Sequence, residues 1–269
     1  MSVIRTAVLQ HAMQADMDLN ADTGVRMIAE AGEAGVQLGV FPEVQLSPFF
    51  AKHKGGDASA WAIDLHHPIL KRFCDAARAA RMVVVANIYL EDEGKRYDAS
   101  PVFDADGRLL GVSKMVHIAQ FDGFWERDYY TPGSRFAVYD TAIGKLGVVI
   151  CYDRHFPESY RACALAGAEF IATPTCVERD EPHDLFEAEL RTLSYHNSIY
   201  ALFANRCGDE DGRSYAGRSA IYGPQGDQLA RAGDEACVLM ADCDKEFRQR
   251  VAQSMDFLGQ LKKGPFGKP

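Results

Sequence analysis

The stretch LGVVICYDRHFPESYRACALAGAEFIATPT, residues 146–175, carries the clearest fold signal in the chain. Its apolar start predicts a strand that ends at Cys151, and a helix is expected from about Phe156 to Ala166. The segment AEFIATPT then predicts a second strand. A strand, a helix and a strand in this order form a βαβ crossover. The stretch therefore predicts a βαβ unit with a thiol at the end of its first strand.

Alternating strands and helices are expected on both sides of this stretch. Strands are predicted at residues 3–10, 36–43, 82–92, 200–207 and 235–244. Helices are predicted from Asn20 or Asp22 to Ala34, and over residues 68–81, 184–199 and 245–255. Hairpins are predicted at residues 97–116, 135–151 and 217–233, the first of them turning at Asp106-Gly107. This succession predicts an α/β protein with mixed sheets and helices on their outer faces.

Bulk composition excludes several classes of protein. With 269 residues, 47% apolar and 25% charged, the chain resembles an ordinary globular protein with a sizeable core. The net charge is −9 and basic residues form no dense run, so nucleic acid is not expected as a partner. No apolar run approaches the roughly 20 residues of a membrane helix. The N-terminus predicts a strand and not a signal peptide, and a cytoplasmic location is expected.

The seven cysteines predict neither a disulfide framework nor a zinc site. Their number is odd and no pair has C-x-x-C spacing. His66 and His67 are adjacent, and no His-x-x-x-His pair exists, so a metal-dependent hydrolase is a weak alternative. No metal or other cofactor is expected. Most buried cysteines serve as small apolar side chains, so a role for Cys151 needs further argument.

Three ionisable residues, Glu43, Lys114 and Cys151, stand at the ends of predicted strands. Such ends meet loops over a rigid base and commonly carry reactive groups. A carboxylate can accept a thiol proton, and an ammonium can stabilise a thiolate and later an oxyanion. The N–H of Tyr152 is expected to donate to the same oxyanion. The set would support acyl transfer at a carbonyl, although Glu43 as a turn cap and Lys114 as a solvated hairpin residue remain alternatives.

The chain resembles the nitrilase superfamily of carbon–nitrogen hydrolases over roughly Val3 to Phe247. The matching segments are GVFPEVQLS around Glu43, GVSKMVHI around Lys114, ERDYYTPG from Glu126 and the opening stretch around Cys151. The resemblance implies a single domain over residues 1–255 that forms a four-layer α-β-β-α sandwich of two mixed sheets. It also implies a homodimer or higher homo-oligomer, with the helices after Cys151 and from Asp184 at the interface. The tail, residues 256–269, would reach across that interface.

Similarity to this family implies a separate catalytic role for each of the matching residues. Cys151 would attack the substrate carbon, and Glu43 would take the thiol proton and pass it to the departing ammonia. Lys114 and the Tyr152 amide would hold the oxyanion. A second glutamate, Glu126, would help to position the substrate, and water would hydrolyse the thioester.

The residues after the nucleophile, CYDR, are more similar to enzymes that cleave N-carbamoyl compounds than to nitrilases proper. By similarity, Arg154 would bind a substrate carboxylate, although the next residue is His155 and not a second arginine. The alternative is an ion pair between Arg154 and Glu158 on one helix face. Further pocket residues are expected near the site, each with plain packing as the alternative: Trp125, His117, Thr175 and the aromatic residues Phe121, Phe124, Tyr129 and Tyr130.

Three functional hypotheses follow. The first is a thiol-dependent amidohydrolase that acts on the ureido group of an N-carbamoyl amino acid or amine and releases ammonia. The second is an ω-amidase or aliphatic amidase that uses the same machinery on a small carboxamide. The third is a non-catalytic binding protein of the same fold, which the intact Glu–Lys–Cys set disfavours.

Overall fold

The computed structural model describes residues 2–262. The first large sheet has seven strands: β1 (Val3–Gln10), β2 (Leu38–Val40), β3 (Val83–Val85), β4 (Ile88–Asp92), β5 (Lys95–Phe103), β6 (Leu109–Lys114) and β15 (Cys237–Asp244). Their order is β15-β1-β2-β3-β5-β4, and β6 pairs with β5. β1, β2 and β3 run parallel, whereas β15 is antiparallel to β1. The sheet is therefore mixed, as predicted.

The second large sheet contains the βαβ unit that opened the sequence analysis. Its strands are β7 (Val138–Thr141), β8 (Gly144–Val148), β9 (Phe170–Thr175), β10 (Tyr200–Asn205), β13 (Ala220–Tyr222) and β14 (Gln228–Arg231), in the order β14-β13-β10-β9-β8-β7. β8 and β9 are parallel, and helix α3 (Pro157–Leu165) connects them. This confirms the predicted crossover.

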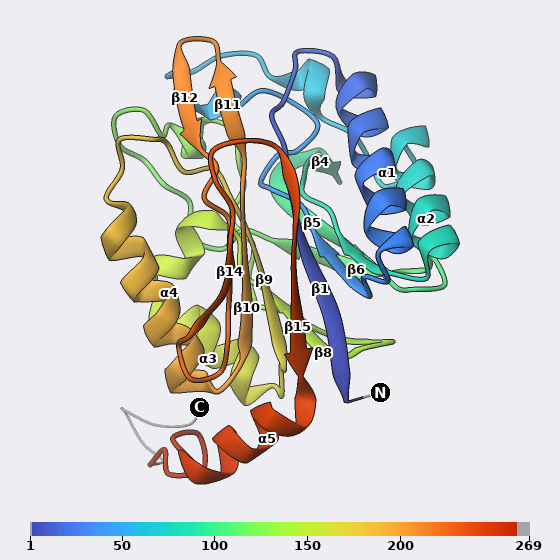
Figure 1. The fold of residues 1–269 in the computed structure, drawn as a ribbon. Helices are drawn as coiled ribbons and strands as arrows, with labels where there is room; N and C mark the ends of the chain where they lie inside the picture. The colour runs from blue at the N-terminus through green and yellow to red at the C-terminus, as the bar shows by residue number, and fades with distance from the viewer. Residues whose placement is uncertain (1, 263–269) are drawn as a thin grey trace.

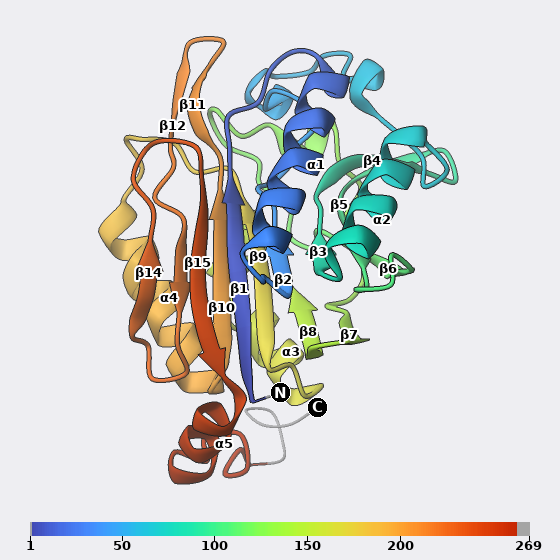
Figure 2. The same ribbon diagram turned by 45° about the vertical axis from the view of Figure 1, so that its right-hand side comes forward.

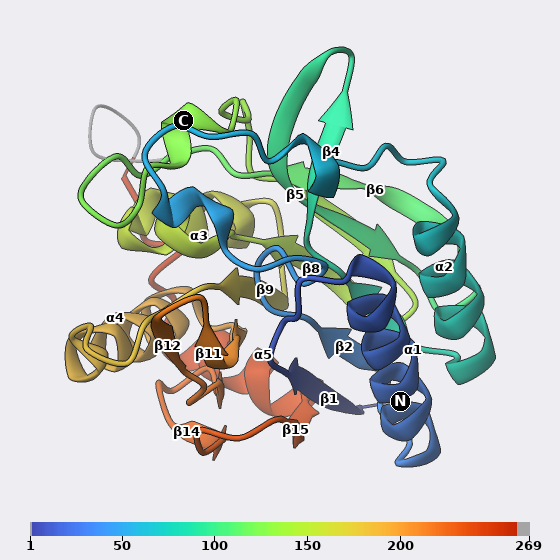
Figure 3. The same cartoon turned by 90° about the horizontal axis from the view of Figure 1, so that it is seen from above.

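Four layers stack around three apolar cores. Helices α1 (Met17–Glu33) and α2 (Pro68–Ala80) cover the outer face of the first sheet, and α3 and α4 (His183–Asn197) cover the second (Figure 1, Figure 3). One core lies between α1, α2 and the first sheet, a second lies between the sheets, and a third lies under α3 and α4. The architecture is the predicted four-layer α-β-β-α sandwich.

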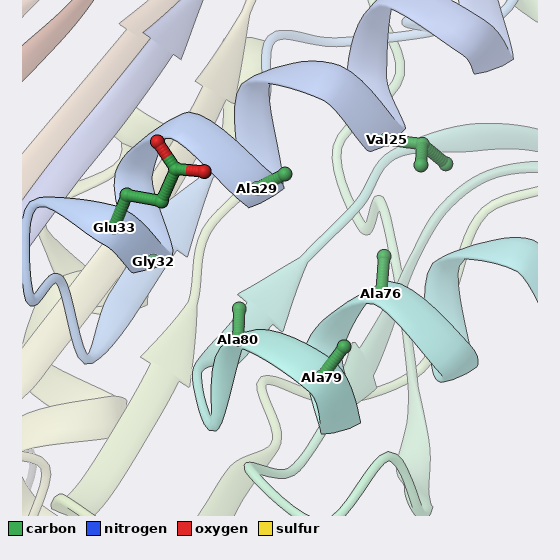
Figure 4. A pocket seen from close by; sticks show the side chains of 7 residues that line it. All are labelled: Val25, Ala29, Gly32, Glu33, Ala76, Ala79 and Ala80. Atoms are coloured by element: carbon green, nitrogen blue, oxygen red, sulfur yellow. The ribbon is translucent and has the colours of Figure 1, made fainter.

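Glycines allow the two helices of one outer layer to pack closely. A Cβ on Gly32 of α1 would lie 2.7 Å from the Cβ of Ala80 on α2, and one on Gly24 would lie 2.8 Å from the ring of Phe73. A groove runs between helices α1 and α2 (Figure 4). It is lined by Val25, Ala29, Gly32, Glu33, Ala76, Ala79 and Ala80. With one carboxylate and otherwise small apolar side chains, this groove has no set of groups suited to catalysis.

Several element boundaries differ from those predicted. Helix α1 begins at Met17, earlier than expected, because its N-cap is Asp16, whose carboxylate accepts from N–H groups of the first turn, and not the expected Asn20 or Asp22. The single strand predicted at residues 82–92 is two strands, β3 and β4. A short hairpin, β11 (Cys207–Glu210) and β12 (Arg213–Ala216), was not predicted and extends beyond the sheets (Figure 1, Figure 2). α5 (Lys245–Ser254) follows β15 as expected.

The predicted tail lies partly outside the described residues. Residues 256–262 form turns after α5, and residues 263–269 lie outside the described part. Among residues 2–262, no helix combines the length and apolar character that crossing a membrane requires.

Candidate active site

Glu43 lies in the loop that follows β2 and is fully buried. Its N–H donates to the Thr175 carbonyl at the end of β9, 3.3 Å away, so the loop bridges the two sheets. Burial, and then the nearby charges of Asp98 and Glu126, raise the pKa of the Glu43 carboxyl well above its ordinary value. The Glu43 carboxyl and the Cys151 thiol each shift the pKa of the other group. Two of the predicted residues, Glu43 and Cys151, therefore lie near one another in the same buried site.

Arg206 fixes the loop that carries Glu43. Its guanidinium is fully buried and donates to the carbonyls of Glu43, at 2.7 Å, and of Val44, at 3.1 Å. Its other end binds both oxygens of Glu210, at 2.6 and 2.8 Å. Val44 has a φ of +42°, which is unfavourable for a β-branched residue. The arginine therefore holds a strained turn that aims Glu43 at the thiol.

Cys151 begins a short 3₁₀ helix directly after the second-sheet strand β8 and Ile150. Its φ of +40° is in the left-handed region, so the thiol stands on a sharp, strained turn. The residue is 5% exposed. Burial raises the pKa of the thiol well above its ordinary value, and Glu43 raises it further, whereas Arg154 acts in the opposite direction. The resting group is a neutral thiol that needs a base.

Glu126 contributes a second buried carboxyl to the site. It begins the short 3₁₀ helix Glu126–Asp128, and its Oε2 accepts from the N–H of Ala119 at 2.9 Å. Burial raises the pKa of this carboxyl to about 8, despite that hydrogen bond. It is one of the charged groups that act on both Glu43 and Cys151. The structure thus brings Glu43, Glu126 and Cys151 together.

A third carboxyl, Asp98, was missed by the sequence analysis. It lies on β5, is fully buried, and interacts with Glu43. Asn87 binds it through Nδ2, 2.7 Å from Oδ1, and also accepts from the N–H of Val44 at 2.6 Å. Burial raises the pKa of Asp98 to about 6, although Glu43 and Asn87 act in the opposite direction. A side chain from the middle of a strand therefore completes the polar cluster.

Lys114 is not part of this cluster, which corrects the prediction. Its Nζ lies 2.7 Å from the Asp92 carboxylate and 3.7 Å from the centre of the Tyr97 ring. In the β5–β6 hairpin, Lys114 is opposite Ala99. Ala99 and Tyr97 belong to the core under α1 and α2, whereas Cys151 belongs to the core between the sheets. The ammonium therefore lies on the other face of the sheet from the thiol.

Met115 occupies the inner face in its place. Its N–H donates to the Asp98 carbonyl at 2.9 Å, and its side chain is buried in the same core as Cys151. Because side chains alternate along a strand, Lys114 and Met115 point to opposite faces. The hairpin therefore places the Met115 thioether on the inner face, where the Lys114 ammonium was expected.

The cation nearest to the thiol is Arg154. Its Nη1 lies 3.8 Å from Cys151 Sγ and donates to the Cys151 carbonyl at 2.9 Å. The guanidinium is 4.5 Å from the ring centre of Phe186 and 3.7 Å from Glu189, both on α4. Arg154 is buried, with 2% of its surface exposed, and its predicted contact with a substrate carboxylate stays a prediction. Its acidic neighbour is Glu189 and not the expected Glu158.

A cavity of about 590 Å³ adjoins the site beside Tyr152. His117 lines it, stacks on Phe156 at 3.7 Å and binds the Asp153 carboxylate through Nδ1 at 2.7 Å. The remaining lining residues are Val116, Ile118, Arg127, Tyr130, Pro132, Tyr152 and Phe156. Tyr152 and His117 therefore lie where a substrate could reach them.

Two further predicted pocket residues, Thr175 and Trp125, have structural contacts. Thr175 Oγ1 donates to the Ala204 carbonyl on β10 at 3.0 Å, and the Thr175 carbonyl holds the Glu43 N–H. Trp125 is half-buried, and the Lys54 ammonium lies 4.8 Å above its ring. The structure gives neither side chain a place in the cavity beside Tyr152. Among the described residues, no cluster of three or more metal-binding side chains is present.

Comparisons with known proteins agree with this architecture. Residues 5–253 match the model of the carbon–nitrogen hydrolase family. The chain is 31% identical to an N-carbamoylputrescine amidase of Solanum tuberosum over 259 residues, covering 90% of this chain and 86% of the relative. It is 30% identical to a citrullinase of Francisella tularensis, with 93% of both chains covered. An omega-amidase of Xenopus tropicalis is 27% identical, with 95% and 94% covered.

Solved structures show the same fold. A carbon–nitrogen hydrolase from Helicobacter pylori matches with a TM-score of 0.91 and 26% identity, covering 97% of this chain and 96% of that one. An amidase of the nitrilase superfamily from Nesterenkonia matches with a TM-score of 0.77 and 26% identity, covering 94% and 95%.

The sandwich fold and these relatives define a hydrolytic enzyme. The chain belongs to the carbon–nitrogen hydrolase family. The nitrilase-superfamily resemblance drawn from the sequence is thereby confirmed.

Proposed function

We propose that the protein hydrolyses the C–N bond of a small ureido or carboxamide compound through a thioester on Cys151. The observation that carries the proposal is the position of the Cys151 thiol on a strained turn, in a buried site that also holds the Glu43 carboxyl and, 3.8 Å from the sulfur, the Arg154 guanidinium. A thiol whose pKa is raised is inert until a base removes its proton. Glu43, whose pKa is also raised, has a matching affinity for that proton.

The chemistry then proceeds in two halves. Glu43 accepts the thiol proton while Cys151 Sγ attacks the carbonyl carbon, and the tetrahedral intermediate collapses as Glu43 gives the proton to the departing ammonia. Water next attacks the thioester, Glu43 takes a water proton, and the thiol is restored. The N–H of Tyr152, in the first turn of its 3₁₀ helix, would donate to the oxyanion in both halves.

Arg154 takes the electrostatic role that the sequence suggested for Lys114. Its Nη1, 3.8 Å from Sγ, would stabilise the thiolate as the proton leaves. Lys114, paired with Asp92 on the outer face, has no part in this proposal. Glu126, whose Oε1 is buried and has no hydrogen-bond partner among the described residues, would accept an N–H of the substrate or donate to its carbonyl when protonated.

The substrate class follows from the excess of acidic groups. Three buried carboxyls, Glu43, Asp98 and Glu126, act on one another at the site, and a ureido group offers N–H donors on both sides of its carbonyl. An N-carbamoyl amine or amino acid is therefore our first candidate, in agreement with the names of the potato and Francisella relatives. A small carboxamide, the substrate class of omega-amidases, is the second candidate.

Ammonia release from a panel of ureido acids, ureido amines and ω-carboxamides tests the proposal. The wild type is expected to prefer one ureido class, whereas Cys151→Ala and Glu43→Gln lose at least about a thousandfold in kcat with an unchanged circular dichroism spectrum. Undiminished turnover by Cys151→Ala would eliminate the thioester route. A preference for carboxamides would select the second candidate.

We further propose that the enzyme is a cytoplasmic homodimer with a single domain over residues 1–255. The outer face of α4 presents Leu185, which is 65% exposed, and the seven cysteines are free. Sedimentation equilibrium tests this assembly: Leu185→Glu should weaken a dimer formed through α3 and α4, and a monomeric wild type would contradict it.

A further inference from the structure

Two of the buried carboxyls in this site, Asp98 and Glu43, are fully buried beside the same amide. Asn87 Nδ2 donates to Asp98 Oδ1 at 2.7 Å, and Asn87 Oδ1 accepts from the N–H of Val44, the residue after Glu43, at 2.6 Å. Asp98 Oδ2 and both Glu43 oxygens are buried and have no hydrogen-bond partner among residues 2–262. Carboxylates can only accept hydrogen bonds, so two buried carboxyls without a donor are stabilised when a proton is retained between them.

We propose that Asp98 is the proton partner of Glu43, so that the two carboxyls share one proton and act together as the base for Cys151. This proposal rests on the proposed function of Glu43. It adds a positioning residue, because Asp98 acts through Glu43 and does not touch the thiol.

The surroundings determine which carboxyl holds the proton at rest. Asn87 Nδ2 donates to Asp98 Oδ1 at 2.7 Å, which favours the ionised form of Asp98. Glu43 has no such nitrogen donor, so the shared proton resides on Glu43 and points at Asp98. The Glu43 oxygen that faces Cys151 then remains free to accept the S–H bond.

The proton transfer balances without any outside group. As Sγ attacks the carbonyl carbon, the S–H bond breaks and a new O–H bond forms on Glu43. At the same time, the proton already on Glu43 moves to Asp98, which becomes neutral. When ammonia leaves, Glu43 gives up the thiol proton and takes its own proton back from Asp98. The pair thus has charge −1 at rest and zero in the tetrahedral intermediate, while Arg154 lies next to the sulfur.

Burial of the pair has a consequence for stability that can be measured without substrate. Glu43 and Glu126 both hold protons in the folded protein that they lose in the unfolded chain near neutral pH. Because the folded state binds more protons, its stability is complete below the unfolded pKa of about 4.3 and declines as pH rises. Other charged or titratable groups around the pair are Tyr130, Cys151, Asp153, Arg154, Cys176 and Arg206.

Urea unfolding from pH 6 to pH 8, at one protein concentration, tests the shared proton. Each retained proton makes the unfolding constant rise about tenfold per pH unit. From pH 6 to pH 8, the unfolding constant of the wild type is expected to rise by a factor at least about ten times larger than that of Asp98→Asn or Glu43→Gln. In these variants an amide N–H replaces the shared proton as the hydrogen-bond donor. The double variant should add little to either change, since one proton is involved. The matched control, Ser100→Ala, removes a neighbouring hydrogen bond to Asn87 without a charge and should remain parallel to the wild type.

Parallel profiles for wild type and Asp98→Asn, or additive changes in the double variant, would overturn the shared proton. For the relay, Asp98→Asn is expected to lower kcat about ten- to a hundredfold with KM within about twofold. An unchanged kcat would overturn the relay. If the stability result holds but the wild type releases no ammonia from any compound of the panel, the proposed function fails and the carboxyl pair stands.

Discussion

Replacing Lys114 by methionine distinguishes the sequence-based mechanism from the structural one. In the structure, the ammonium binds Asp92 at 2.7 Å and lies over the Tyr97 ring. The two charged side chains are 26% and 41% exposed, so solvent screens their attraction. Exposed ion pairs contribute about 0.2–1 kcal/mol, and exposed cation–π contacts contribute a similar amount. We therefore expect Lys114→Met to lose about 1 kcal/mol of unfolding free energy and to keep kcat within about twofold.

The assay combines ammonia release with urea unfolding. Asp92→Asn is the matched control, because it removes the partner of the same pair and should cost a similar free energy. The double variant should be about as stable as either single variant, since neighbouring residues that share one interaction are not additive. All three variants should retain the kcat of the wild type.

A different outcome would refute the argument from strand register. Loss of a group that stabilises an oxyanion lowers kcat by about a hundred- to a thousandfold. If Lys114→Met shows such a loss with little change in stability, while Asp92→Asn remains active, the ammonium acts at the thiol. The placement of Lys114 on the outer face of the sheet would then be wrong.

Three further predictions concern the charges around the thiol. Arg154→Gln should lower kcat about tenfold or more, because a cation 3.8 Å from Sγ favours the thiolate, and Arg154→Lys should retain more of the wild-type kcat than Arg154→Gln. Steady-state kinetics on both variants measure this, and a fully active Arg154→Gln would contradict it. Alkylation of Cys151 by iodoacetamide, followed by peptide mass spectrometry, should still accelerate at pH 9, because the pKa of the thiol is raised; a plateau below pH 8 would contradict this. Arg206→Met should lower the free energy of unfolding by about 3–5 kcal/mol, because it leaves the buried Glu210 carboxylate unpaired. Adding Glu210→Leu should restore much of that free energy. Urea unfolding measures both variants, and an Arg206→Met variant as stable as the wild type would contradict the role of Arg206 in holding the Glu43 loop.

Local sequence patterns were sufficient to predict the α/β class and the order of most elements, whereas the four-layer arrangement was predicted from the resemblance to the family. The strand before Cys151, helix α3 and strand β9 have their expected order, since an apolar run, a helix start at Pro157 and a second apolar run are local signals. The hairpin at Asp106-Gly107 was also correct, because Gly107 adopts the positive φ that its turn requires. The split between β3 and β4 was missed because only the polar Asn87 interrupts the apolar run from Met82 to Leu90, and a single polar residue does not by itself mark a break.

The face on which Lys114 lies could not be predicted with the same certainty. A shift of one residue in the pairing of two strands moves every side chain to the other face of the sheet. The β5–β6 hairpin contains an irregularity between Val102 and Phe103, which shifts its register. The sequence does not mark this shift, so Lys114 and Met115 were equally plausible neighbours of the thiol. The resemblance to the family favoured the lysine, and the three-dimensional pairing favours the methionine.

Asp98 and Arg206 were missed for a related reason. Each lies in or directly after a strand of buried residues, and neither has a local motif that signals its partner. Their partners, Glu43 and Glu210, are 55 and 4 residues away, and only the packed sheets bring the first pair together. A buried charged residue in an apolar strand is costly unless paired, which is the one signal that the sequence offered.

The charge balance of the site connects these observations. Three ionised carboxyls, Glu43, Asp98 and Glu126, buried around one thiol would be prohibitively unfavourable, since each would lack its hydration. Two protons, one shared by Glu43 and Asp98 and one on Glu126, leave a single negative charge near neutral pH. The Arg154 guanidinium, 3.8 Å from the sulfur, compensates this charge. A lysine on the inner face, in place of Met115, would leave the site positively charged or ionise Glu126. We therefore infer that the presence of Asp98 compensates for the outward position of Lys114. Because no ammonium lies at the thiol, a second carboxyl gives Glu43 the proton affinity that its role as base requires.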